Sequence, residues 1–82
     1  MAARLRRLSA RELLTVLGSL GFQVVAVRGS HAKLRREGPN GESQTLTVPL
    51  HRELAAGTLR AICRQASRYV PEEELRRRFF GD

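Results

Sequence analysis

Two turn signals divide the middle of the chain into three runs with the pattern of strands, and this division most constrains the fold. The first run, 22–28, is rich in β-branched residues, and the Gly29-Ser30 pair after it is typical of a two-residue hairpin turn. Gly38-Pro39-Asn40-Gly41 is a loop signal between the other two runs, 31–35 and 43–49, which alternate apolar and polar residues. The sequence therefore predicts a three-stranded antiparallel meander.

The alternation also assigns the side chains of this meander to two faces. Successive side chains of a strand point to opposite sides of the sheet, so Ala32 and Leu34 share one face with Leu46 and Val48. This face is apolar, and the other is polar and basic. The polar face is predicted to carry Gln23, His31, Lys33, Arg35, Thr45 and Thr47.

Helix signals lie on both sides of the meander. Ser9 and Glu12 match a capping box, and leucines at helical spacing follow, which predicts a first helix over about 10–20. A second helix is expected to open at 56–58 with Thr58 as its cap, and a last one to begin at Pro71. Because nothing else can cover the apolar sheet face, the two main helices must pack on it. The order α-β-β-β-α, with a short C-terminal helix, predicts an α+β fold of the double-stranded-RNA-binding-domain type.

The length of 82 residues allows one domain, 1–82. Within it, residues 1–8 are expected to be a short basic arm, and 71–82 an Arg-rich C-terminal helix. Lys and Arg number 15 against 8 Asp and Glu, for a formal charge of +7. Arginine makes forked contacts with phosphate, which suits nucleic acid. An Arg-rich proteome would produce the same bias, so composition alone leaves the two explanations open.

Several classes of protein are excluded by what the chain lacks. Its single cysteine, Cys63, rules out an internal disulfide and a multi-thiolate metal site, and we expect it to be a small core residue. The longest apolar run, 24–27, is too short to cross a membrane. The sequence predicts a soluble cytoplasmic protein with no metal and no cofactor.

The segment Arg28-Gly29-Ser30-His31 places one of only two histidines among cations. Histidine can give or take a proton near neutral pH. Metal-independent RNA cleavage uses the neighbouring 2′-OH as nucleophile and needs a base, an acid and cations that stabilise the charge on phosphorus. His31 suits either proton role, while Lys33 and Arg35, on the same face, could hold the phosphate. Ser30 could bind a phosphate oxygen, and the second proton role stays unassigned.

Other residues are candidates with competing explanations. Arg60 and Arg64 belong to a cationic helix stripe that could contact RNA, contact a protein partner or simply be solvated. His51, two residues after Pro49, could be a second functional histidine or could cap the following loop. Lys33 and Arg35 could equally form a solvated strand face, and His31 a surface histidine without a role.

Four segments of the chain carry a family resemblance: Leu20-Gly21-Phe22, Arg28-Gly29-Ser30-His31, Thr47-Val48-Pro49-Leu50-His51 and Gly57-Thr58-Leu59-Arg60-Ala61-Ile62-Cys63-Arg64-Gln65-Ala66. Over about residues 5–78, the chain resembles the HicA (YcfA-like) mRNA interferase toxins of toxin–antitoxin pairs. The resemblance implies ribosome-independent cleavage of mRNA, with His31 as the catalytic residue. It also implies a HicB-type antitoxin that covers the active surface. The segment 71–82 departs from many relatives, which are shorter or less basic there.

Two other functions remain open. A non-catalytic RNA-binding module of the same fold would grip phosphates by shape. Such modules usually have lysines at the start of their last helix, where this chain has Ala55-Ala56-Gly57-Thr58. A DNA-binding regulator is a third possibility, but no helix-turn-helix spacing is evident.

Overall fold

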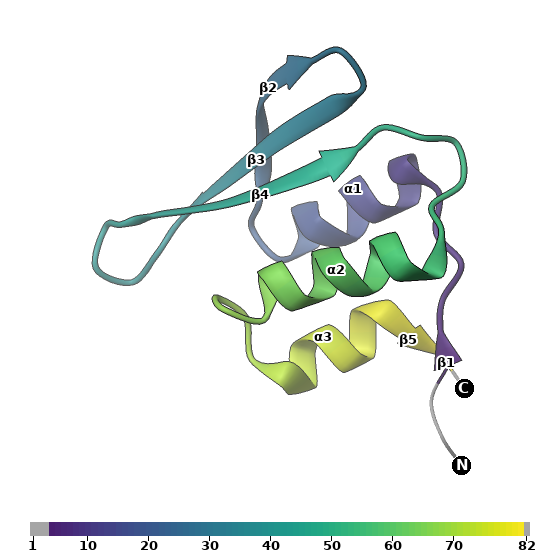
Figure 1. Ribbon diagram of the computed structural model, residues 1–82. Helices are drawn as coiled ribbons and strands as arrows, with labels where there is room; N and C mark the ends of the chain where they lie inside the picture. The colour runs from purple at the N-terminus through teal and green to yellow at the C-terminus, as the bar shows by residue number, and fades with distance from the viewer. Residues whose placement is uncertain (1–3, 82) are drawn as a thin grey trace.

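The computed structural model describes residues 4–81 of the chain. A three-stranded sheet lies on a layer of two helices, and a third helix packs beside the second (Figure 1). The elements are, in order, β1 (Arg4–Leu5), α1 (Ala10–Ser19), β2 (Gln23–Arg28), β3 (His31–Glu37), β4 (Ser43–Pro49), α2 (Ala56–Ala66), α3 (Glu72–Phe79) and β5 (Phe80–Gly81). This order confirms the predicted α+β fold of the double-stranded-RNA-binding-domain type.

The predicted capping box starts α1. The Glu12 N–H donates to Ser9 Oγ at 3.1 Å, and the Ser9 N–H donates to Glu12 Oε1 at 3.0 Å. The backbone and side-chain hydrogen bonds with Ser9 lower the pKa of Glu12, because they favour its charged form. The helix ends at Ser19, one residue before the predicted end, and Gly21 follows it with a left-handed φ of 96°.

The meander is antiparallel, with the order β2-β3-β4. Gly29, with a φ of 59°, lets the chain reverse within two residues, so Arg28 faces His31 across the hairpin. On the other side of β3, the pairing runs from His31 opposite Pro49 to Glu37 opposite Ser43. The predicted meander and its first turn are confirmed, and β3 is the central strand.

The helices cover only part of the apolar sheet face. Ala32, Leu34, Leu46 and Val48 are buried against α1 and α2, as predicted. Val24 lies opposite Leu34, and Val27 opposite Ala32, on the same face. Their exposed fractions are nevertheless 46% and 60%, and that of Val25, at a register shift, is 52%. The prediction that the helices cover this face is right for β3 and β4 and wrong for β2.

Residues 1–3 of the expected arm lie outside the described residues, and residues 4–8 are packed against the rest of the chain instead of forming an arm. Arg4 pairs with Gly81, and Leu5 with Phe80, in a two-stranded antiparallel ladder. The Arg6 N–H donates to the carbonyl of Phe79 at 2.8 Å, and Leu8 is buried in the core. The two described ends therefore lie side by side at the base of the molecule (Figure 1).

The second helix starts at Ala56, within the expected segment 56–58. Its N-cap is Ala55, which makes no side-chain hydrogen bond, and Thr58 lies within the first turn. The predicted Thr58 cap is therefore wrong. One side of the helix is apolar and packs on the core, where Leu59, Ile62 and Ala66 are buried. Cys63 is half-buried beside them, and burial, together with repulsion from Glu72, raises the pKa of its thiol.

The last helix begins at Glu72, immediately after Pro71, and ends at Phe79, short of the expected helix over 71–82, because Phe80 and Gly81 are in β5. Leu75 and Phe79 dock it on the core. Arg76 and Glu72, and Arg78 and Glu74, form ion pairs at i,i+4, and Arg77 contacts Glu74 at i,i+3. These pairs are largely exposed, so each adds little to stability. Burial of the apolar stripe is what holds α3 in place.

Candidate functional site

His31 is the first residue of the central strand, and its side chain is exposed. It is paired with Arg28 on one side and with Pro49 on the other. Paired residues of an antiparallel ladder present their side chains to the same face. The tight turn at Gly29-Ser30 thus brings the predicted site residues Arg28, Ser30 and His31 together at one end of the sheet.

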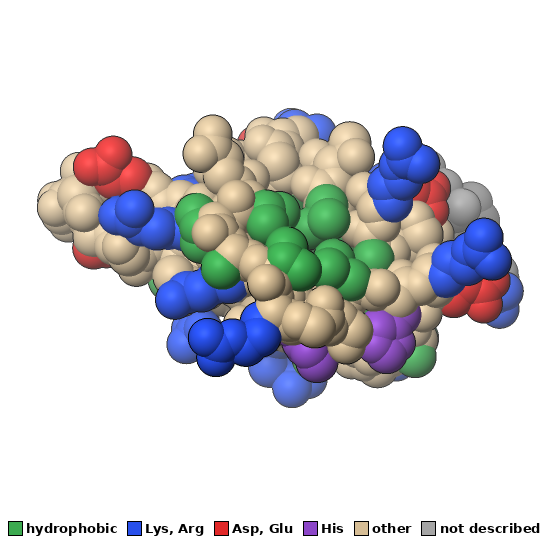
Figure 2. Space-filling view, turned by 90° about the horizontal axis from the view of Figure 1, so that it is seen from above, with side chains coloured by type: hydrophobic (Ala, Val, Ile, Leu, Met, Phe, Trp, Pro, Cys, Tyr) green, Lys and Arg blue, Asp and Glu red, His purple; other side chains and the backbone are tan. Residues whose placement is uncertain are grey.

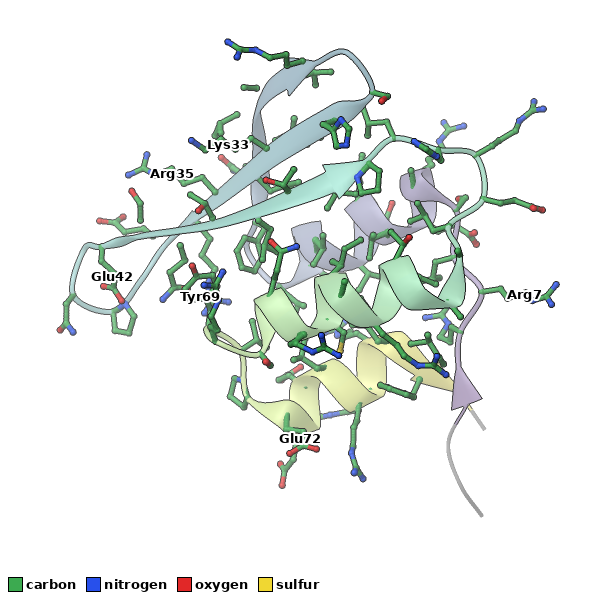
Figure 3. The ribbon with its side chains drawn as sticks, in the orientation of Figure 1. Arg7, Lys33, Arg35, Glu42, Tyr69 and Glu72 are labelled. Carbon is green, nitrogen blue, oxygen red and sulfur yellow. The ribbon has the colours of Figure 1, made fainter. Side chains whose placement is uncertain are left out.

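Lys33 and Arg35 continue from His31 along the same face of β3. Both are exposed, while Ala32 and Leu34 are buried on the other face. Members of this row follow one another at about 7 Å along the strand. Arg35 Nε donates to Ser43 Oγ at 2.8 Å, and Figure 3 shows Lys33 and Arg35 pointing away from the helix layer. We call Arg28, Ser30, His31, Lys33 and Arg35 the basic sheet face.

The second histidine lies in the same region of the surface. His51 is exposed just beyond β4, and its carbonyl accepts from the Ala10 N–H at 3.2 Å. The Leu50 N–H donates to the Ser30 carbonyl at 2.6 Å, which ties this segment to the turn before His31. Figure 2 shows the histidine side chains gathered on one face, beside a hydrophobic patch.

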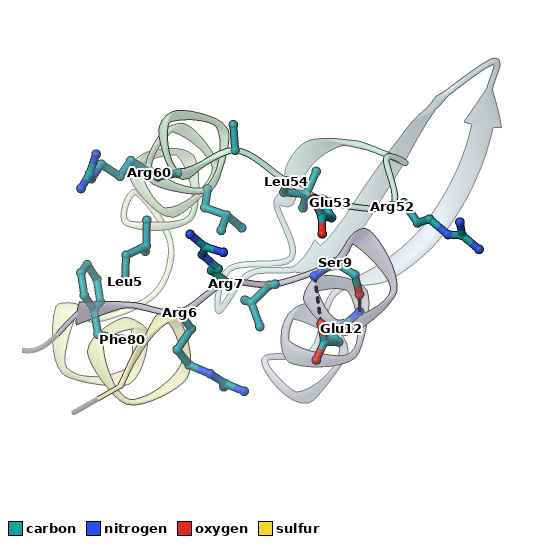
Figure 4. Close-up of a pocket in the computed structure, with 14 residues that line it drawn as sticks. Leu5, Arg6, Arg7, Ser9, Glu12, Arg52, Glu53, Leu54, Arg60 and Phe80 are labelled. Carbon is teal, nitrogen blue, oxygen red and sulfur yellow. Dashed lines mark hydrogen bonds between the residues drawn. The ribbon is translucent and has the colours of Figure 1, made fainter.

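Two of the predicted RNA contacts are elsewhere. Arg60 and Arg64 are exposed on α2, which packs under the apolar side of the sheet (Figure 1). Arg60 lines a pocket of about 1100 Å³ between the N-terminal segment and the start of α2 (Figure 4). The other charged side chains that line this pocket are Arg6, Arg7, Glu12, Arg52 and Glu53. Sequence reasoning missed this cluster, because it depends on how residues 4–8 pack.

Arg36 stands next to the basic sheet face in sequence, but it points to the opposite side. Its Nε donates to Gln44 Oε1 at 2.8 Å, and its terminal nitrogens donate to the carbonyls of Leu20 at 2.8 Å and Tyr69 at 3.2 Å. The guanidinium also lies over the Phe22 ring, 5.2 Å from its centroid. Arg36 is therefore a structural residue that joins β3 to the ends of two helices.

The basic sheet face has no carboxylate partner within residues 4–81. The ion pairs of this part of the chain all lie within α3. Unpaired cations on one face of a chain with a net charge of +7 create a positive potential there. The face is therefore suited to bind an anionic ligand.

The composition of the described residues also limits the class of site. Nowhere in residues 4–81 do three His, Cys, Asp or Glu side chains gather in a way that could hold a metal ion. Within the same range, every helix is too short or too polar to cross a membrane.

The chain is a small α+β domain with the α-β-β-β-α order of the double-stranded-RNA-binding-domain fold, and it carries a basic face on its sheet. A family model described as the HicA toxin of bacterial toxin-antitoxin systems matches residues 10–67. This match spans well over half of the chain, which therefore belongs to the HicA toxin family. It runs from α1 to the end of α2, so β1, α3 and β5 lie outside it. Comparisons with curated proteins and with solved structures gave no significant match.

Proposed function

We propose that this chain is the toxin of a type II toxin–antitoxin pair and a metal-independent endoribonuclease that cleaves mRNA. The observation that carries the proposal is the exposed His31 at the end of a row of unpaired cations, inside the segment that matches the HicA toxin family. A proton-transfer group beside phosphate-binding cations is what cleavage through the 2′-OH requires. The protein partner in this proposal is a HicB-type antitoxin.

The proposed roles follow from position along the strand. His31 acts as general acid or base at the scissile phosphate. Ser30 and the turn N–H groups bind a phosphate oxygen, while Arg28 flanks the same point across the hairpin. Lys33 and Arg35 stabilise charge at that phosphate or hold the next ones. His51 is the candidate for the second proton role, because it shares this region of the surface.

The first test is cleavage of a labelled single-stranded RNA in excess EDTA by the native protein and by His31→Ala. We expect the substitution to reduce the cleavage rate by about 10²–10⁴-fold, because general acid–base catalysis contributes that much. RNA affinity, measured by fluorescence anisotropy, should change little, since Lys33 and Arg35 remain. His51→Ala is assayed in the same way as a second test variant, and an equal loss would assign the second proton role to His51.

Three results would contradict the proposal. Binding of RNA without cleavage by the native protein would make the chain a non-catalytic RNA-binding module. Equal cleavage by the native protein and by His31→Ala would remove His31 from the reaction. A native protein that cleaves only after addition of a divalent metal ion would overturn the metal-independent mechanism.

A further inference from the structure

The outer edge of β2 combines two features that sheet proteins normally avoid together. Within residues 4–81, β2 pairs only with β3, so its other edge presents free backbone N–H and C=O groups. The exposed large hydrophobic side chains of this part of the chain, Val24, Val25 and Val27, all belong to the same strand. An unpaired edge with apolar side chains is a template for another strand.

At the opposite edge of the sheet, part of β4 is protected by other residues of the chain. On β4, the Thr47 N–H is directed outward and donates to Gln65 Oε1 at 3.4 Å. At the end of the same strand, Pro49 has no N–H to offer. The chain thus protects the end of the β4 edge near Pro49 with its own residues, while no such contact is made along the β2 edge.

We propose that the β2 edge pairs with a β-strand of an acidic protein partner, which extends the sheet from three strands to four. The strand would supply apolar side chains to Val24 and Val27 and acidic side chains to the basic sheet face. This inference rests on the proposed pairing with an antitoxin, and it does not depend on RNA cleavage. It states that the partner docks by strand pairing and that its strand carries apolar and acidic side chains.

Charge decides between the occupants of this edge. Three cations near this edge lack carboxylate partners within residues 4–81: Arg28 at the end of β2, and Lys33 and Arg35 on the neighbouring strand. Figure 2 shows Lys and Arg side chains around the hydrophobic patch. A second copy of the chain would bring another +7 to the same place, whereas an acidic strand would neutralise it. Single-stranded RNA stacks its bases on aromatic rings, but the three large side chains exposed here are aliphatic.

The position of the edge gives the docking a consequence for the site. β2 ends at Arg28, which is the direct partner of His31. A strand laid along β2 therefore passes beside Arg28, one strand away from His31. We expect a partner docked at this edge to hinder access of RNA to the basic sheet face.

The test uses full-length His31→Ala and the protein encoded by the reading frame beside its gene. Binding is measured by calorimetry, and amide hydrogen exchange is followed in the free chain and in the complex. We expect amides within Gln23–Arg28 to gain protection, because free strand-edge N–H groups become hydrogen-bonded. We expect Val27→Glu, added to the His31→Ala chain, to weaken binding by about tenfold or more, since it places an unpaired acidic group in an apolar contact with an acidic partner. The control is Ala61→Glu, the same charge change on the exposed side of α2.

The outcomes separate this inference from the proposed function. If the neighbouring protein does not bind at all, the pairing fails and the edge inference fails with it. If it binds, but Val27→Glu behaves like Ala61→Glu and residues 23–28 stay unprotected, only the edge inference is overturned. It is also overturned if the free chain sediments as a dimer that Val27→Glu dissociates, or if RNA alone protects β2.

Discussion

Two adjacent arginines on β3 lie on opposite faces of the sheet, so their position along the strand determines whether they are exposed or contact the core. Arg35 is exposed on the basic sheet face, whereas Arg36 is half-buried on the other side. The period of two predicts this division from the sequence. It does not predict that the carbonyls of Leu20 and Tyr69 receive the Arg36 guanidinium, because these acceptors come from distant parts of the chain.

Replacement of Arg36 should therefore destabilise the fold much more than replacement of Arg35. We expect Arg36→Met to lower the free energy of unfolding by about 2–4 kcal/mol. The substitution removes the charged hydrogen-bond donor of Gln44 and of two backbone carbonyls, and leaves these acceptors without a partner. Arg35→Met should stay within about 0.5 kcal/mol, as is usual for an exposed position. Urea unfolding followed by circular dichroism measures both, and equal losses would refute the assigned role of Arg36.

At the level of single residues, part of the candidate site was predictable. Alternation places His31, Lys33 and Arg35 on one face from sequence alone, whereas the pairing of Arg28 with His31 comes from the structure. The place of Arg60 was not predictable, because it depends on the packing of α2 against the N-terminal segment. Local patterns specify a face of a strand, while tertiary packing specifies which faces meet.

At the scale of elements, local signals again predicted best. The capping box, the hairpin turn and the alternating strands involve residues a few positions apart, and all are present. The β1–β5 ladder joins the two ends of the described chain through strands of two residues each, which have no periodic pattern to detect. The exposure of β2 could not be predicted either. Its β-branched residues predict a strand, but they do not show whether another element packs against it.

The third helix belongs to the core although it lies outside the family match. Phe79 is fully buried, and Leu75 is 2% exposed. We expect Phe79→Ala to lower the free energy of unfolding by about 3–5 kcal/mol, the usual cost of truncating a buried aromatic residue. Phe80→Ala, at a half-buried neighbour, should cost clearly less. Denaturant titration compares the two, and a small loss for Phe79→Ala would mean that α3 is dispensable for the fold.

At the scale of the whole molecule, the charge of +7 should make RNA binding strongly dependent on salt. Each cation that neutralises a phosphate of a single strand contributes about 0.7 to the slope of log K against log salt concentration. We expect Lys33→Gln, in the His31→Ala chain, to reduce this slope by about that amount. Arg76→Gln should leave it unchanged, because Arg76 lies on α3 and contacts Glu72. Equal slopes for Lys33→Gln and the parent chain would exclude Lys33 from the RNA contact.

The ladder between β1 and β5 also gives the backbone an unusual layout. Since Arg4 and Gly81 are strand partners, the described chain comes close to a ring. A short linker could join these two residues without crossing the sheet, and the exposed loop around Asn40 and Gly41 could supply the new ends. We expect such a circular permutant to keep the same architecture, with His31 and its cations in one unbroken segment.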